Sequence, residues 1–135
     1  MAELFEYALV RVVPRVERGE CMNVGVLLWC QAADYLDLRC VLDARRLAAL
    51  DPFLDLDAVG THLDALHRVC RGGPGAGAAA VMSPGERFRW ITAPRSTVVQ
   101  TSPVHSGMTM DPAAQLDHLV ELLVCPQTSP GASAG

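Results

Sequence analysis

Hydrophobic and polar positions form several short segments along this chain, and the longest apolar run lies between Glu20 and Cys30. The run is rich in valine, contains Gly25 and follows the turn signal Arg18-Gly19, so it predicts a β-strand in preference to a helix. Both faces are largely apolar beyond its polar start, and we therefore expect a central strand covered on both sides. Strict alternation would place one set of side chains on a single face: Met22, Val24, Val26, Leu28 and Cys30.

Two further strands are predicted next to this central strand. Phe5 to Val13 is a run of aromatic and β-branched residues that ends at Pro14, which cannot donate to a ladder. Tyr35 to Leu42 alternates apolar with polar residues, so one of its faces is core and the other is wet. Short turns at Arg15 to Gly19 and at Ala32 to Asp34 connect the three strands and predict an antiparallel meander.

Cap residues and helical spacing predict three helices. Asp43 is a good N-cap for a short helix over Ala44 to Leu50, and Asp55 caps a longer helix that ends at about Cys70. Asp111-Pro112, an acid followed by proline, begins the last helix. The two longer helices carry apolar stripes, at Leu56, Val59, Leu63, Leu66 and Val69 and at Leu116, Leu119, Val120, Leu123 and Val124. We expect these two to be the main helices packed on the sheet.

The second half of the chain also contains segments with weaker patterns. Gly72 to Gly85, rich in glycine and alanine, predicts a flexible loop inside the domain. Glu86 to Thr92 alternates arginine with aromatic residues, a pattern that favours a strand with a basic face. A short strand is expected over Ser96 to Gln100, and Thr101 to Met110 reads as loop.

These elements predict one α+β domain over residues 1–125, with an antiparallel sheet of about five strands and two main helices, followed by a disordered tail over 126–135. A chain of 135 residues fits one core, and 50% hydrophobic with 19% charged residues is typical of globular proteins. The net charge of −4 gives no general reason to bind nucleic acid or an anionic membrane. Because no leader-like segment or long apolar stretch is present, we expect a cytoplasmic location without membrane association.

The basic residues and the cysteines both favour simple explanations. All eleven basic residues are arginine, which a GC-rich genome explains more economically than selection for phosphate-binding forks. Strand-borne arginines at 11, 39, 87 and 89 could form an RNA-binding stripe, but pairing with Glu6, Asp37 and Glu86 is the more economical interpretation, so nucleic-acid binding is disfavoured. The five cysteines show neither a Cys-x-x-Cys pair nor zinc spacing, so we expect free thiols, mostly buried, and no metal or cofactor.

The densest polar grouping of the second half begins at Arg95-Ser96-Thr97 and continues to His105 and Ser106. A guanidinium, hydroxyls and an imidazole could hold a phosphate or carboxylate, although an ordinary solvated turn is the favoured alternative. The candidate anion pocket combines Arg11, Asn23, Arg46, Arg95, Ser96 and His105. No nucleophile elbow, justified Ser-His-Asp order or phosphate-binding glycine loop with a lysine is present, so no catalytic residue is assigned and an enzymatic activity is disfavoured.

Several short motifs of the chain occur together in one known family: Glu6-Tyr7-Ala8, Arg11-Val12-Val13-Pro14, Arg18-Gly19-Glu20 to Leu27, Asp43 with Arg46, and Ala93-Pro94-Arg95-Ser96. On these motifs, the chain resembles the bacterial DUF3037 family, small single domains of unknown function, over roughly Phe5 to Val124. The most specific motif is Asn23-Val24-Gly25-Val26. The resemblance supplies no catalytic residue, and it implies that this chain is similar to the small partner of a HipA-like kinase, beside which such proteins are often found.

Two functional hypotheses follow. The leading hypothesis is a non-catalytic partner or regulatory subunit of a HipA-like kinase, which binds through an exposed sheet edge or the apolar part of a helix face. The alternative is a small enzyme or an anion- or phosphate-binding domain that uses the arginine-rich pocket. A homo-oligomer is compatible with either hypothesis.

Overall fold

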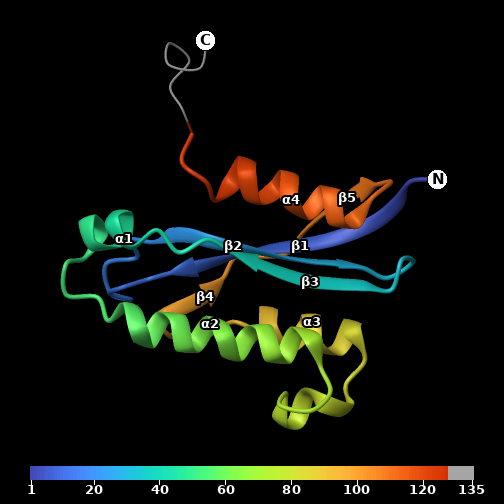
Figure 1. Cartoon of the computed structure of the whole chain (residues 1–135), viewed down its shortest axis with the longest axis horizontal. Helices are drawn as coiled ribbons and strands as arrows, with labels where there is room; N and C mark the ends of the chain where they lie inside the picture. Colours follow the sequence, from blue (N-terminus) through green and yellow to red (C-terminus); the bar gives the residue numbers. More distant parts are fainter. Residues whose placement is uncertain (128–135) are drawn as a thin grey trace.

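The computed structural model describes residues 1–127, which form one antiparallel sheet with helices on both of its faces (Figure 1). In chain order, the elements are β1 (Glu3–Val12), β2 (Met22–Cys30), β3 (Tyr35–Cys40), α1 (Ala44–Leu50), α2 (Leu56–Arg71), the short 3-10 helix η1 (Gly77–Val81), α3 (Pro84–Thr92), β4 (Val99–Thr101), β5 (His105–Thr109) and α4 (Pro112–Leu123). The expected α+β class and the five-stranded antiparallel sheet are confirmed.

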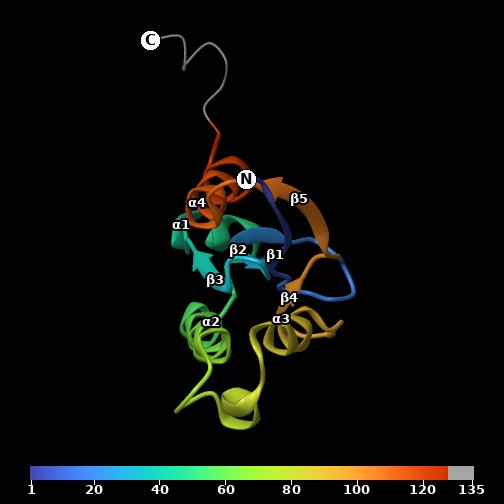
Figure 2. The same cartoon turned by 90° about the vertical axis from the view of Figure 1, so that its right-hand side faces the viewer.

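The strands are arranged in the order β3-β2-β1-β4, and β5 pairs with the N-terminal half of β1 on the same side as β4. α2 and α3 cover one face of this sheet, whereas α4 covers the other face (Figure 2). The described residues thus contain α1 and α3 in addition to the two expected main helices. The sheet is the middle of three layers.

The N-terminal meander and the three helix starts follow the sequence pattern closely. β1, β2 and β3 pair antiparallel in chain order, and Gly19 has the positive φ of 72° that the first turn requires. The carboxylates of Asp43, Asp55 and Asp111 each accept a hydrogen bond from the backbone N–H three residues later, at 3.0 to 3.2 Å. Because these amides have no partner inside the helix, local sequence is sufficient to set where the three helices begin.

A β-bulge at Val24 changes which side chains of β2 face each helix layer. Val10 of β1 lies opposite Gly25, but the next residue, Arg11, lies opposite Asn23, so Val24 is an extra residue in β2. The expected strict alternation is therefore wrong across the bulge. Met22, Val24, Leu27 and Trp29 pack on the α2 and α3 side, whereas Val26, Leu28 and Cys30 pack on the α4 side.

Gly25 sits where the bulge brings β2 against the backbone of β3. A Cβ atom added at Gly25 would lie 2.8 Å from the carbonyl oxygen of Arg39 and 2.7 Å from Sγ of Cys40. Backbone cannot move aside as a flexible side chain can, so this position requires glycine. The motif Asn23-Val24-Gly25-Val26 is thus the sequence of the bulge.

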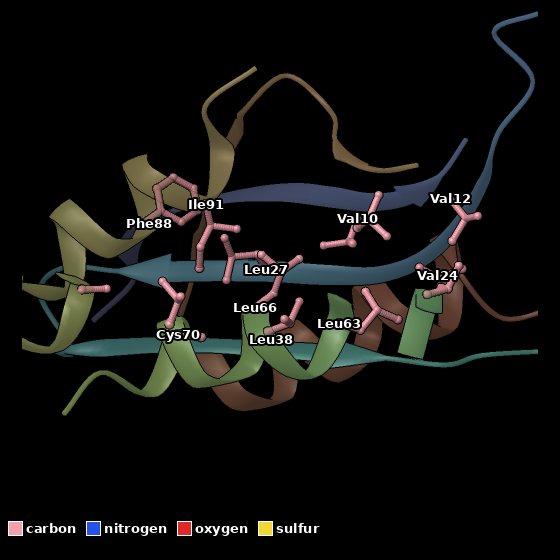
Figure 3. Close-up of a cluster of buried hydrophobic side chains, with 14 of the residues drawn as sticks. Val10, Val12, Val24, Leu27, Leu38, Leu63, Leu66, Cys70, Phe88 and Ile91 are labelled. Atoms are coloured by element: carbon pink, nitrogen blue, oxygen red, sulfur yellow. The ribbon is translucent and has the colours of Figure 1, made fainter. Parts of the chain in front are cut away.

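The larger hydrophobic core lies between the sheet and α2 and α3 (Figure 3). Leu27 from the sheet, Leu66 from α2 and Phe88 from α3 belong to this cluster, and each such buried side chain contributes about 1.5–3 kcal/mol. A smaller core lies under α4 and includes Leu28 and Leu116. β2 is therefore buried on both faces, as expected for the central strand.

The strand expected over Glu86 to Thr92 is wrong, because this segment forms α3. Ser83 Oγ accepts a hydrogen bond from the Glu86 backbone N–H at 3.3 Å, and the Glu86 carboxylate accepts one from the Ser83 N–H at 3.0 Å. This capping box, with proline at the first helical position, starts the helix. The capping signal outweighs the alternation of arginine with aromatic residues.

Three other segments contain more structure than the sequence indicated. The expected loop over 72–85 includes η1, whose Ala79 is buried in the core. β4 begins at Val99, not at Ser96, and β5 lies inside the expected loop over 101–110. β5 forms because the long β1 has backbone groups on the side away from β2 that need partners.

The disordered tail expected over 126–135 is only partly described by the structure. The side chain of Gln127 donates to three backbone carbonyls at the end of α4, and residues 128–135 lie outside the described residues.

Candidate functional site

The structure does not bring the six residues of the candidate anion pocket together. Asn23 and Arg46 lie at the C-terminal end of α4, and Arg11 is the neighbour of Asn23 across β1 and β2. Arg95 follows α3 on the opposite face of the sheet, with the exposed Ser96 next to it. The sixth residue, His105, is exposed on β5, where its ring lies tilted against that of Tyr7 with centroids 5.3 Å apart.

The group at the end of α4 serves mainly as a helix cap. Asn23 Nδ2 donates to the carbonyl oxygen of Leu123 at 3.1 Å, and Arg46 Nη1 donates to that of Val124 at 3.3 Å. These carbonyls lack partners within the helix and carry its negative dipole end, which a guanidinium stabilises. Within residues 1–127, Arg11 Nε is buried and has no hydrogen-bond partner. Arg11 is thus the member of the group with a spare buried donor, and its affinity for an anion stays a prediction.

Arg95 caps α3 and positions an aromatic side chain. Its guanidinium donates to the carbonyl oxygens of Ile91 at 2.7 Å and Trp90 at 2.6 Å, which satisfies two carbonyls of the last turn. The same guanidinium lies 4.6 Å from the centre of the Trp90 ring, a cation–π contact. Arg95 therefore holds one face of the Trp90 indole in a fixed place.

The Trp90 indole borders a shallow hollow of about 510 Å³ beside α3, which we call the tryptophan hollow. Its lining residues are Trp29, Met82, Gly85, Glu86, Arg89 and Trp90. Trp90 is 44% exposed, so a large apolar ring is presented to solvent at the rim. A partner's apolar side chain could fill this hollow and bury the indole.

The floor of the tryptophan hollow is preformed. The Trp29 ring packs on Phe88 with centroids 5.5 Å apart, and a Cβ added at Gly85 would lie 2.8 Å from Trp29 Cζ2. The Arg89 guanidinium lies 5.5 Å from the Trp29 ring centre and donates to both carboxylate oxygens of Glu6, at 2.9 and 3.0 Å. Gly85 and the Arg89–Glu6 ion pair together hold the Trp29 ring in place. The ring therefore loses little conformational freedom when a partner binds.

Sequence reasoning missed this site because it assigned the wrong period to α3. In a strand, Phe88 and Trp90 would share one face, but in a helix they point about 160° apart. Phe88 therefore enters the core and Trp90 leaves it. The signal that could have located the site is Ser83-Pro84 followed by Glu86, which marks a helix start. The arginines were expected to pair with Glu6, Asp37 and Glu86, and two of these carboxylates do have an arginine partner: Arg89 bonds to Glu6, and Arg39 lies 3.7 Å from Asp37. The expectation for Glu86 is wrong, because its carboxylate accepts from the Ser83 N–H, and the neighbouring Arg87 donates to the carbonyl oxygens of Cys70 and Met82.

Two other hollows, of about 440 and 430 Å³, adjoin Phe53 in the turn between α1 and α2. The first contains Arg15 and Arg18, but Asp51 lies 3.8 Å from Arg15 and Glu20 lies 2.5 Å from Arg18. The paired carboxylates reduce the attraction of this hollow for an anion. The second is lined mainly by apolar side chains, and Phe53 itself is 86% exposed.

The cysteines are free, and no group of three or more metal-ligating side chains gathers anywhere in residues 1–127. Burial raises the pKa of the Cys40 thiol to about 12, and burial likewise raises that of Cys70 to about 12. Both thiols therefore stay protonated and poorly nucleophilic near neutral pH. None of the helices described here is long and apolar enough to cross a membrane.

The fold and the tryptophan hollow define a small three-layer α+β domain with a preformed aromatic surface. Residues 7–124 match the family described as "Protein of unknown function (DUF3037)", so the chain belongs to the DUF3037 family. No curated protein and no solved structure matches the chain.

Proposed function

We propose that this protein is a non-catalytic partner subunit that binds a HipA-like kinase through the tryptophan hollow. The observation that carries the proposal is the exposed Trp90 indole, stacked on Arg95 and set beside Trp29 and Arg89. Tryptophan, arginine and methionine are enriched at protein interfaces, and tryptophan and arginine dominate binding hot spots. A rigid indole next to a preformed hollow suits a partner that inserts an apolar side chain.

Membership in the DUF3037 family supports the choice of partner. Proteins that resemble this chain often accompany a HipA-like kinase, and a small domain with a preformed aromatic surface suits the role of the smaller member of such a pair. This context is associational, so the surface itself must carry the test.

The use of the polar residues supports a binding role in preference to catalysis. Asn23 and Arg46 bond to the end of α4, Arg95 bonds to the end of α3, and Arg89 bonds to Glu6. These side chains hold the three layers together and shape the hollow. Residues committed to helix caps and ion pairs would have to break those contacts to bind an anionic substrate.

Co-purification with the neighbouring HipA-like kinase tests the proposal directly. We expect Trp90→Ala to weaken the complex at least tenfold, because a hot-spot side chain contributes about 2 kcal/mol or more and about 1.4 kcal/mol is tenfold in Kd. Phe53→Ala is the matched control, because Phe53 is also an exposed aromatic residue but lies next to other hollows. Equal affinities for wild-type and Trp90→Ala protein would contradict the assignment of the hollow, and failure of any complex to form at micromolar concentrations would contradict the function.

A further inference from the structure

The two outer edges of the sheet differ in how their backbone groups are protected. On the β3 edge, the backbone N–H of Leu38 donates to the carboxylate of Asp37 at 2.9 Å. The Arg39 guanidinium lies beside Asp37 and also bonds to Asp117 of α4. Charged side chains and an amide that is already satisfied prevent another strand from adding to an edge. The β3 edge is therefore protected against the addition of another strand.

β5 forms the opposite edge, along the N-terminal half of β1 (Figure 2). In a strand, the N–H and C=O of one residue point to the same side, and successive residues alternate. Ser102 N donates to Leu9 O at 2.8 Å, so Leu9 directs its backbone groups toward β4 and β5. Alternate residues back along β1, including Tyr7 and Phe5, do the same.

This alternation determines which groups of β5 point away from the sheet. Tyr7 lies opposite His105 and Phe5 lies opposite Gly107, so His105 and Gly107 make the ladder with β1. The N–H and C=O groups of Ser106 and Met108 then point outward. Among residues 1–127, the β5 strand pairs with β1 alone.

The β5 edge also lacks charged side chains of the kind that protect the β3 edge. Residues 104–110 include no Asp, Glu, Lys or Arg. Met108 is 61% exposed, and Leu4, opposite it on β1, is 59% exposed. An uncharged edge with exposed apolar side chains is a template for pairing with another strand.

We propose that this edge pairs with β5 of a second copy of the same chain, antiparallel about a two-fold axis at Gly107. In this register, Ser106 of one copy lies opposite Met108 of the other, and the symmetry repeats the pair. Each of the two pairs joins residues whose N–H and C=O already point outward, so each can exchange two hydrogen bonds. The two sheets become one continuous sheet across the axis.

The composition of the edge favours a second copy as the occupant. The same register places Val104 opposite Met110 of the copy, so exposed apolar side chains meet at both ends of the pairing. At the centre, glycine meets glycine with Cα atoms about 4.5 Å apart, the closest pair type in an antiparallel ladder. No like charges face each other, because the segment has none. The edge is therefore complementary to itself.

This inference goes beyond the proposed function, because it concerns the sheet edge and not the tryptophan hollow. Within one copy, Ser106 and Met108 lie opposite Glu6 and Leu4 of β1. The two-fold axis is perpendicular to the sheet, so the α3 faces of both copies lie on the same side of the joined sheet. The dimer would present two tryptophan hollows in the same direction. A monomer that still binds the kinase would contradict only the dimer.

Sedimentation of the full chain from low to high micromolar concentration tests the proposal. The pairing segment is short, so we expect a dimer with a micromolar Kd and a mass that rises toward twice 14.5 kDa. Ser106→Pro removes the outward N–H without removing a bond to β1, and it should sediment as a monomer. Ser106→Ala keeps the N–H and should dimerise like the wild type.

Met108→Lys is the second variant, because an exposed residue can be changed without loss of the fold. The lysine charge should prevent the two β5 strands from pairing. The proposal is overturned if wild-type protein stays monomeric over the whole range, or if the folded Met108→Lys variant dimerises like wild type. It is also overturned if the edge pairs only when another protein is added, since the occupant is then a heterologous strand.

Discussion

At the scale of single residues, Gly25 is the position of the central strand at which a side chain would meet neighbouring backbone at 2.8 Å. It follows the extra residue of the bulge, and it lies against the backbone of β3 at Arg39 and Cys40. The bulge also turns Asn23 toward α4, where its side chain caps the last turn. One short motif therefore sets both the spacing of β2 and β3 and the attachment of α4.

We expect Gly25→Ala to lower the free energy of unfolding by about 1–3 kcal/mol, because the added methyl group overpacks a site with backbone on one side. Urea denaturation measures the change. Gly60→Ala in α2 is the matched control, since no atom lies within 4 Å of its added Cβ and alanine favours the helix by about 0.5–1 kcal/mol. A Gly25→Ala protein as stable as wild type would show that the bulge is not tightly packed.

Cysteine reactivity tests the burial of the α2 face. Cys40 and Cys70 have a pKa raised to about 12 by burial, so neither thiolate is populated at neutral pH or at pH 9, whereas Cys21 is exposed. Native protein treated with an alkylating reagent should carry the label on Cys21 well before it appears on Cys40 or Cys70. Mass spectrometry of the digested protein locates the label. Equal rates for Cys21 and Cys70 would contradict the packing of α2 on the sheet.

At the scale of elements, α3 is the segment that links the sequence to the site. The Ser83 and Glu86 capping box begins it, Phe88 and Ile91 bury one side, and Trp90 remains on the other. Arg95 then satisfies carbonyls of its last turn. The position of the tryptophan hollow therefore depends on the helix being complete at both ends.

We expect Ser83→Ala to cost about 1 kcal/mol of stability, because it leaves the Glu86 N–H without its side-chain acceptor. Thermal or urea unfolding measures this loss. Ser96→Ala, at an exposed serine beyond the same helix, should change stability by less than about 0.5 kcal/mol. Equal effects of the two substitutions would mean that the cap contributes nothing.

The sequence predicted those elements that depend on signals between near neighbours in the chain. The meander β1 to β3 and the helices capped by Asp43, Asp55 and Asp111 needed only period, turns and caps. β5 could not be found this way, because His105–Thr109 is mostly polar without a regular apolar alternation, and its partner strand is about a hundred positions away in the chain. The bulge was hidden for a similar reason, since an extra residue in a strand is visible only against its neighbour.

The candidate site could be predicted only in small part, for related physical reasons. Arg46 and Arg95 were singled out as ligands of an anion, but in the structure their guanidiniums donate to backbone carbonyls at helix ends, which residue types do not reveal. Trp90 was placed on the same strand face as Phe88, opposite the arginines, because a period of two was read where the helix has 3.6. The side chain that carries the proposed function was thus identified only once the helix was known.

At the scale of the whole molecule, the three layers keep different surfaces apart. α2 and α3 with the sheet form the larger core and present the tryptophan hollow, whereas α4 closes the other face (Figure 1). β5 lies at an outer edge of the sheet, and this edge lacks the charged side chains and the satisfied amide that protect the edge at β3. The surfaces that we propose for partner binding and for self-association therefore lie at separate places on one small domain.

Hydrogen exchange of the chain with and without the proposed partner, a HipA-like kinase, is the most direct test of the central claim, that the tryptophan hollow is the docking surface. We predict slower exchange on complex formation in peptides that cover Pro84–Thr92, with little change in Pro112–Leu123 of α4 on the other face. Protection confined to α4, with α3 unchanged in a stable complex, would contradict the account.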